Sequence, residues 1–154
     1  MAGGATIVTC PNCNSRNRIR AGQLGVPRCG VCHTALPWLV EADARSFDGE
    51  IVSSLPVLVD LWAPWCGPCK MVSPVVEKAG REHAGRLKVV KLNVDEAPQV
   101  AGRYEVRGIP LLLLLKDGAE VDRLLGAVPP ARLEAWLAPN LPAREHSAAG
   151  AGAD

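Results

Sequence analysis

The stretch that decides the fold is Val59-Asp60-Leu61-Trp62-Ala63-Pro64-Trp65-Cys66-Gly67-Pro68-Cys69-Lys70. Its first part belongs to an apolar run, residues 56–62, which contains one acid and has the character of a central buried β-strand. The Cys-x-x-Cys pair then opens a segment with helical spacing, residues 69–82. A cysteine at the start of a helix is favoured as thiolate, because free backbone N–H groups and the helix dipole stabilise the anion. The stretch therefore predicts an α/β domain with a redox-active cysteine pair.

The flanking sequence continues the α/β pattern on both sides of this stretch. Further strands are expected at residues 6–9, 87–94, 111–116 and 121–126, and further helices at residues 48–54, 97–104 and 130–137. Asp117-Gly118 between two of these strands is a hairpin signal. We expect a small module at residues 1–36, a linker at 37–45, an α/β domain at 46–141 and a flexible tail at 142–154.

All six cysteines fall into Cys-x-x-Cys pairs, and two of the pairs lie near the N-terminus. Fifteen residues separate Cys10/Cys13 from Cys29/Cys32, a spacing typical of a tetrahedral four-thiolate zinc site. Residues 10–36 are too short for a hydrophobic core of their own, so a metal would stabilise them. We predict one structural zinc per chain, held by Cys10, Cys13, Cys29 and Cys32 in a zinc-ribbon-like module. Two local disulfides, or a second redox-active pair, are the alternatives.

The composition argues against a nucleic-acid or membrane partner. The formal net charge is only +1, although residues 1–36 carry four arginines and no acid. Three of these arginines lie within residues 16–20 without interleaved aromatic residues, which indicates a solvated basic loop. The sequence suggests neither a signal peptide nor a membrane-spanning run, so we expect a reducing cytoplasm.

The segment around Cys66 resembles the active-site segment of the thioredoxin family almost position by position, and the resemblance extends over roughly residues 45–140. The further matches are Pro74 in the active-site helix, Lys91-Leu92-Asn93-Val94-Asp95 as the third strand, Arg107-Gly108-Ile109-Pro110 as a cis-proline loop, and Gly126 in the substrate groove. With the four cysteines ahead of it, the chain looks like the thioredoxin 2 type. The resemblance implies a thioredoxin fold, with a central mixed sheet flanked by helices, and a monomer. One departure is Leu111, where the family usually has Thr.

The resemblance also implies roles for single residues. Cys66 is expected to be the attacking thiolate and Cys69 the more buried thiol that resolves the mixed disulfide. Asp60 is expected to be buried, with a raised pKa that suits proton exchange with Cys69, the alternative being a strand-end acid exposed to water. Lys91 is expected either to tune Asp60 electrostatically or to be a solvated surface lysine. The residues expected to bind an extended substrate strand are Trp65, Gly67, Pro68, Ile109, Pro110 and Gly126.

The function that these features predict is a protein-disulfide reductase. Such a protein takes electrons from a thioredoxin reductase and passes them to disulfides in client proteins, without an organic cofactor. Gly-Pro between Cys66 and Cys69 favours a reductase, because the same context in thioredoxin accompanies a strongly reducing pair. The alternatives are a disulfide oxidase or isomerase, and a zinc-regulated module that binds clients, holds unfolded chains or senses oxidants.

Overall fold

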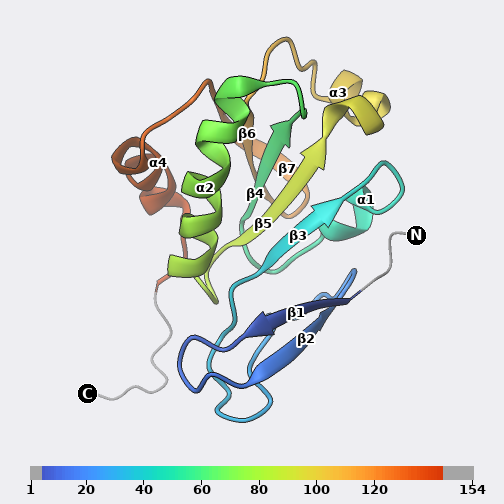
Figure 1. Cartoon of the computed structure of the whole chain (residues 1–154). Coiled ribbons are helices and arrows are strands. Elements are labelled where there is room, and N and C mark those ends of the chain that lie inside the picture. The colour runs from blue at the N-terminus through green and yellow to red at the C-terminus, as the bar shows by residue number, and fades with distance from the viewer. Residues whose placement is uncertain (1–4, 144–154) are drawn as a thin grey trace.

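A five-stranded mixed sheet forms the centre of the computed structural model, which describes residues 5–143 (Figure 1). The strand order is β3-β5-β4-β6-β7. Strands β3, β5 and β4 run parallel to one another, β6 runs antiparallel to β4, and β7 runs antiparallel to β6. The strands are β3 (Leu39–Ala42), β4 (Val57–Trp62), β5 (Lys88–Asn93), β6 (Leu111–Lys116) and β7 (Ala119–Leu125). The thioredoxin-like arrangement predicted from the sequence is therefore present.

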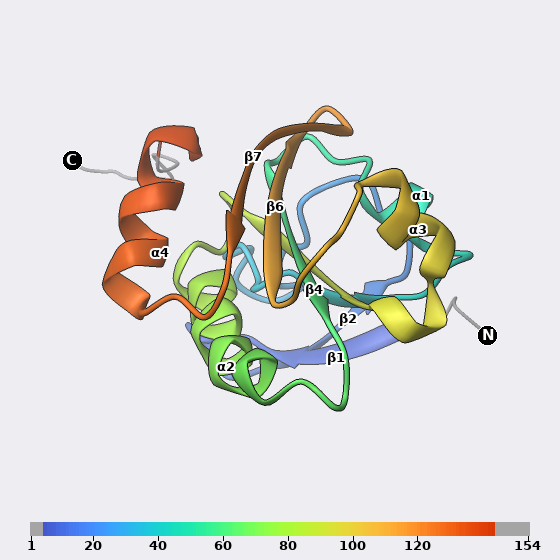
Figure 2. The same cartoon turned by 90° about the horizontal axis from the view of Figure 1, so that it is seen from above.

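Helices cover both faces of this sheet. They are α1 (Phe47–Glu50), α2 (Gly67–Glu82), α3 (Pro98–Arg103) and α4 (Pro130–Leu137), with short 3-10 turns at η1 (Val94–Glu96) and η2 (Ala138–Asn140). Figure 2 shows α2 and α4 on one face and α1 and α3 on the other. Two hydrophobic cores result, one under each pair of helices.

Strand β4 lies at the centre of both cores. Its neighbours are β5 and β6, and its residues from Val57 to Leu61 are all buried. Because side chains alternate along a strand, Val57, Val59 and Leu61 pack toward α1 and α3, whereas Leu58 packs toward α2 and α4. Asp60 therefore points to the α2 side. This enclosure on both faces explains why the sequence of β4 is continuously apolar except for that one acid.

The N-terminal module is a hairpin of β1 (Ala5–Thr9) and β2 (Arg16–Arg20), followed by an irregular segment. It packs on the α/β domain through a third cluster, to which both parts of the chain contribute. The buried members of this cluster are Cys10, Ile19, Cys29, Leu36, Trp38 and Leu55. The module thus shares a core with the domain instead of having one of its own.

Residues 37–45, which we expected to be a linker, instead contain part of the fold. Trp38 is buried, and β3 forms the edge of the central sheet by pairing with β5. A four-residue edge strand is too short to show a period in sequence, which is why the pattern did not indicate it. The predicted tail at 142–154 lies almost entirely outside the described residues.

A buried ion pair joins the module to the domain. The ammonium of Lys88, fully buried, donates to the Glu50 carboxylate at 2.9 Å and to the Glu50 carbonyl oxygen at 2.6 Å. The other carboxylate oxygen of Glu50 accepts from the backbone N–H of Gly22 in the module, at 2.8 Å. The ammonium also lies 4.5 Å from the centre of the Trp38 ring. Loss of one partner of such a pair costs about 3–5 kcal/mol, because the other charge stays buried.

The other predicted elements are present with small shifts at their ends, except that the helix expected at 48–54 is the shorter α1, which ends at Glu50. The helix at 130–137 is α4, the strand at 111–116 is β6, and α2 starts two residues before the predicted position. Strand β2 was not predicted, because Ile19 is the one buried residue in its otherwise polar sequence. Within residues 5–143 no helix has the length and apolar character needed to cross a membrane.

Candidate functional site

Cys66 and Cys69 form a disulfide at the N-terminal end of α2, close to the carboxyl end of β4. Cys66 is the N-cap of the helix, and its Sγ accepts a hydrogen bond from the backbone N–H of Cys69 at 3.1 Å. Pro68 lies in the first turn, where a missing N–H leaves no helical hydrogen bond unmade. The backbone thus stabilises negative charge on the Cys66 sulfur. Both cysteines are buried, with 4% and 3% of their surfaces exposed, so the expected contrast in burial is slight in the disulfide form.

The cis-proline loop meets the cysteine pair. The Ile109–Pro110 peptide bond is cis, as expected, and Ile109 packs on the small cluster around Cys66 and Cys69. The N–H of Gly126 donates to the carbonyl of Pro110 at 2.9 Å. Gly126 has a φ of +100°, a conformation that favours glycine. The structure therefore brings Ile109, Pro110 and Gly126 together.

The other three predicted groove residues are exposed beside the cysteine pair. Trp65 has 70% of its surface exposed, and its indole N–H donates to the carboxylate of Asp95 at 2.9 Å. Gly67 and Pro68 are also exposed. A flat apolar ring held by one hydrogen bond is therefore exposed directly next to the disulfide.

Asp60 is buried, with 1% of its surface exposed, so the alternative of a water-exposed acid at the end of the strand is wrong. Neither carboxylate oxygen has a hydrogen-bond partner among the described residues. Burial raises the pKa of Asp60 to about 6, although the positive charge of Lys91 opposes this rise. An acid with this pKa can both take and give a proton near neutral pH.

Lys91 is nearly buried on β5, directly beside Asp60 in the sheet register, and is not a solvated surface lysine. Its ammonium donates to the Glu77 carboxylate at 2.7 Å and to the hydroxyl of Ser73, both on α2. The hydrogen bond from Lys91 lowers the pKa of Glu77. Sequence reasoning missed Glu77 and Ser73. Their i, i+4 spacing on one face of α2 was a signal, but nothing in the sequence connects that face to Lys91.

A cavity of about 210 Å³ is lined by Lys91 and Ser73 of this charged group and by Cys69 of the cysteine pair. The residues that line it are Glu41, Trp62, Ala63, Pro64, Cys69, Lys70, Ser73 and Lys91. Cys69 and Lys91 therefore border the same space. This arrangement offers a place where protons can be exchanged on the inner side of the disulfide.

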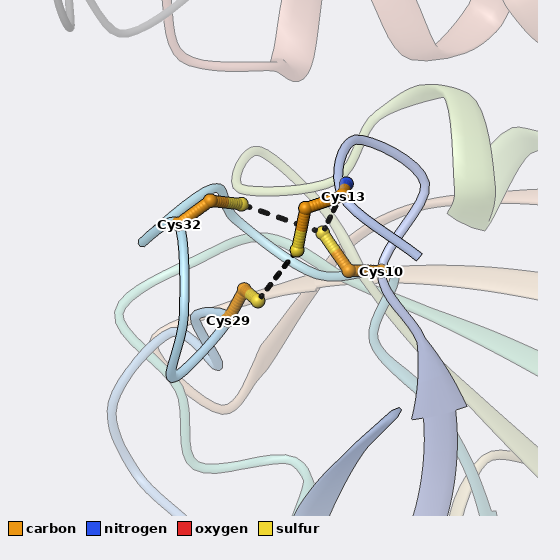
Figure 3. A group of neighbouring side chains, drawn as sticks. All are labelled: Cys10, Cys13, Cys29 and Cys32. Atoms are coloured by element: carbon orange, nitrogen blue, oxygen red, sulfur yellow. Dashed lines mark hydrogen bonds between the residues drawn. The ribbon is translucent and has the colours of Figure 1, made fainter. Parts of the chain in front are cut away.

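The four N-terminal cysteines form a second cluster, shown in Figure 3. Their Sγ atoms all lie within 4.8 Å of one another, and the Cys10–Cys32 and Cys13–Cys29 pairs are 3.6 Å apart. Thiolates that hold a tetrahedral zinc at about 2.3 Å lie roughly 3.8 Å from each other, whereas bonded sulfurs are much closer. The geometry fits a metal site and does not fit two local disulfides.

The two halves of this cluster have the same backbone conformation. In each, the residue after the second cysteine, Asn14 or His33, has a positive φ and donates its N–H to the first cysteine's carbonyl. One residue further, the hydroxyls of Ser15 and Thr34 contact the sulfurs: Ser15 lies 3.0 Å from Cys29 Sγ, and Thr34 3.2 Å from Cys32 Sγ. Sequence reasoning did not identify these hydroxyls.

Hydrogen bonds favour the thiolate form of Cys29 and Cys32. The backbone N–H of Cys32 and the Ser15 hydroxyl are the main causes that lower the pKa of Cys29 to about 5. The Asn12 side chain, at 3.4 Å, and Thr34 lower the pKa of Cys32 to about 7. Although the backbone N–H of Cys13 acts to lower it, burial and the contacts with Cys32 and Cys29 raise the pKa of Cys10. Metals bind thiolates and not thiols, so the lowered pKa values of Cys29 and Cys32 suit a metal ion such as zinc.

The family profile that matches this chain and the relatives described below are all thioredoxins. The profile of the thioredoxin family matches residues 38–139. Thioredoxin 1 of Nostoc sp. is 50% identical over 97 residues, which cover 62% of this chain and 91% of the relative. The thioredoxin of Porphyra purpurea is 52% identical over 93 residues, 60% of this chain and 87% of the relative. A chloroplastic M-type thioredoxin of Pisum sativum is 51% identical over 89 residues, 57% of this chain and 52% of the relative.

The family match begins after the four-cysteine cluster, and none of these three relatives is named thioredoxin 2. The matched part contains the sheet, the helices and the disulfide at the start of α2. The chain belongs to the thioredoxin family, and it is a dithiol–disulfide reductase of the thioredoxin type with Cys66 and Cys69 as its active pair.

Proposed function

We propose that Cys66 is the attacking thiolate and that Cys69 resolves the intermediate. The Cys66 thiolate attacks one sulfur of a client disulfide, which forms a mixed disulfide and releases the first client thiolate. Cys69, deprotonated, then attacks the Cys66 sulfur, and the second client thiolate leaves. Two electrons pass from the dithiol to the client, and the Cys66–Cys69 disulfide remains. The helix N-terminus at Cys66 is the observation that carries this assignment.

Asp60 is proposed to take the proton of Cys69 during resolution. Its burial and its pKa of about 6 support this role, because the carboxylate is a base at neutral pH yet can return the proton when the disulfide is reduced again. The client chain is proposed to lie along Ile109 and Pro110 as an added strand, against Trp65, Gly67, Pro68 and Gly126.

The partners follow from the family, which implies disulfide-containing clients and a thioredoxin reductase. We further propose a thioredoxin 2 type protein that carries one zinc, bound by Cys10, Cys13, Cys29 and Cys32. When bound, zinc supplies a structural cross-link between the two halves of the module. Four thiolates kept unpaired suit a reducing compartment, and we propose the cytoplasm.

The roles of the two cysteines are tested by trapping. Cys69→Ser, mixed with a peptide that contains an internal disulfide, should accumulate a covalent adduct on Cys66, because the resolving thiol is absent. Intact mass and peptide mapping measure the adduct and separate it from reaction at the four N-terminal cysteines. Cys66→Ser is the matched control and should give no adduct at Cys69; an adduct there would reverse the assignment.

The role of Asp60 is tested by Asp60→Asn. Because the folded-state pKa of about 6 exceeds the ordinary 3.8, the folded protein keeps a proton that the unfolded chain loses between these two pH values. Stability therefore falls as pH rises through this window. Asp60→Asn should raise the free energy of unfolding by about 3 kcal/mol at neutral pH and change it little at about pH 4. Urea titrations at both pH values measure this difference.

Asp60→Asn should also slow the resolving step, the attack of Cys69 on the mixed disulfide, by at least roughly tenfold. Asp117→Asn, in the exposed turn between β6 and β7, is the control and should change neither quantity. A variant that is stabilised but resolves at the normal rate would exclude Asp60 as the proton acceptor.

The zinc site is tested by metal analysis of Cys66→Ser/Cys69→Ser, in which the active pair can neither bind metal nor react. We expect one zinc per chain, retained after mild peroxide treatment because Cys10 and Cys29 are buried in the shared core. Release of the zinc by peroxide would contradict a purely structural role. Absence of zinc in protein purified without chelators would contradict the site itself.

A further inference from the structure

Three charged side chains form a row across the sheet on the side that faces α2. The register places Glu41 of β3 beside Lys91 of β5, and Lys91 beside Asp60 of β4. The next position in the row, on β6, is the apolar Leu112. A lysine between two carboxylates would ordinarily pair with one of them in the plane of the sheet.

Lys91 forms an ion pair with neither Glu41 nor Asp60, because its ammonium points toward α2. It donates to Glu77 at 2.7 Å and to Ser73, which occupy one face of α2 at i and i+4. Ser73 also donates to the same Glu77 oxygen at 3.1 Å, so the three groups form a closed hydrogen-bonded set. Asp60, the most buried carboxyl of the group, is left without a hydrogen-bond partner among the described residues.

We propose that Glu77, with Ser73, is a positioning residue that holds the Lys91 ammonium on α2 and thereby keeps it from pairing with Asp60. Asp60 can then hold a proton on the inner side of the cysteine pair. If Lys91 paired directly with Asp60, the carboxylate would be stabilised and would release its proton at a lower pH. The inference rests on the proposed role of Asp60 and explains how its proton affinity is set.

The charges around Asp60 support this positioning role. The titratable or charged groups that act on it, or that line the cavity beside Lys91, are Lys91 of β5, Glu41 of β3, and Glu77, Cys69 and Lys70 of α2. Glu77 and Glu41 both raise the pKa of Asp60, and Lys91 lowers it, but burial is the largest influence. Three carboxyl groups thus share one nearly buried ammonium. Glu77, which receives its hydrogen bond, is the one whose pKa is lowered.

In the proposed reaction, one proton passes between Cys69 and Asp60. In resolution, the S–H bond of Cys69 breaks, its proton moves to the Asp60 carboxylate, and the sulfur keeps the electron pair with which it attacks Cys66. In the reverse direction, the Asp60 carboxyl returns the proton to the Cys69 thiolate. Glu77 makes no contact with either sulfur in this scheme. It adjusts the pH, set mainly by burial, at which Asp60 changes from acceptor to donor.

The test is a carbon-13 NMR titration of the Asp60 carboxyl in the full chain, with Glu77→Gln. Removal of the Glu77 charge, together with release of Lys91 toward Asp60, should lower the titration midpoint of Asp60 by about 0.5–1 pH unit. Glu82→Gln, an exposed change of the same charge on the same helix, is the matched control and should leave the midpoint in place. An unchanged or raised midpoint in Glu77→Gln would overturn the proposal.

A double-mutant cycle with Lys91→Met decides whether Glu77 acts through the lysine. Glu77→Gln should shift the Asp60 midpoint less than half as far when Lys91 is absent; an equal shift would show that Glu77 acts directly on Asp60 and would overturn a positioning role. The pH profile of the resolving step should move with the NMR midpoint. Because the titration reports on Asp60 itself, failure of Glu77 as a positioning residue is distinguishable from failure of Asp60 as a proton acceptor, which Asp60→Asn tests.

Discussion

The enclosure of β4 between two strands and two layers of helices is the constraint on which the rest of the structure depends. It removes water from Asp60, and desolvation raises the pKa of that carboxyl into the range where it can exchange protons at neutral pH. The same strand leads into the start of α2, where the helix backbone stabilises a thiolate on Cys66. One buried strand therefore positions both the proposed nucleophile, Cys66, and the proposed proton acceptor, Asp60, a few residues apart. A buried acid is unfavourable for stability, which is consistent with a residue kept for chemistry.

The four-cysteine module depends on the same domain in a different way. Cys10 and Cys29 are buried in a core completed by Trp38 and Leu55 of the α/β domain, so the inner half of the cluster is protected by domain side chains. The Glu50–Lys88 pair and the Gly22 N–H add a polar link in which every partner is satisfied by another. A module of this size cannot bury enough apolar surface alone. The shared core therefore supports the module, and the zinc that we propose would add a second support.

Much of this could be predicted from the sequence, because the signals were local. The apolar run of β4 and the Cys-x-x-Cys at the helix start lie within a dozen residues, and the paired N-terminal cysteines lie within about two dozen. Strand β3 could not be predicted, since four residues at a sheet edge carry no pattern. The contact of Lys91 with Glu77 and Ser73 could not be predicted either. Its geometry depends on how α2 crosses β5, which is a property of tertiary packing and not of spacing.

The most direct test of the reductase assignment is the reduction potential of the Cys66–Cys69 pair in the full, metal-loaded chain, measured at neutral pH by equilibration with a dithiol buffer. A reductase that uses a Gly-Pro turn and a moderately stabilised thiolate should have a potential close to about −270 mV, the value typical of thioredoxin itself. A potential near about −120 mV would mean that the reduced pair is strongly stabilised. Electrons would then flow from the clients to this chain, which would act as an oxidant, and its assignment as a reductase would be contradicted.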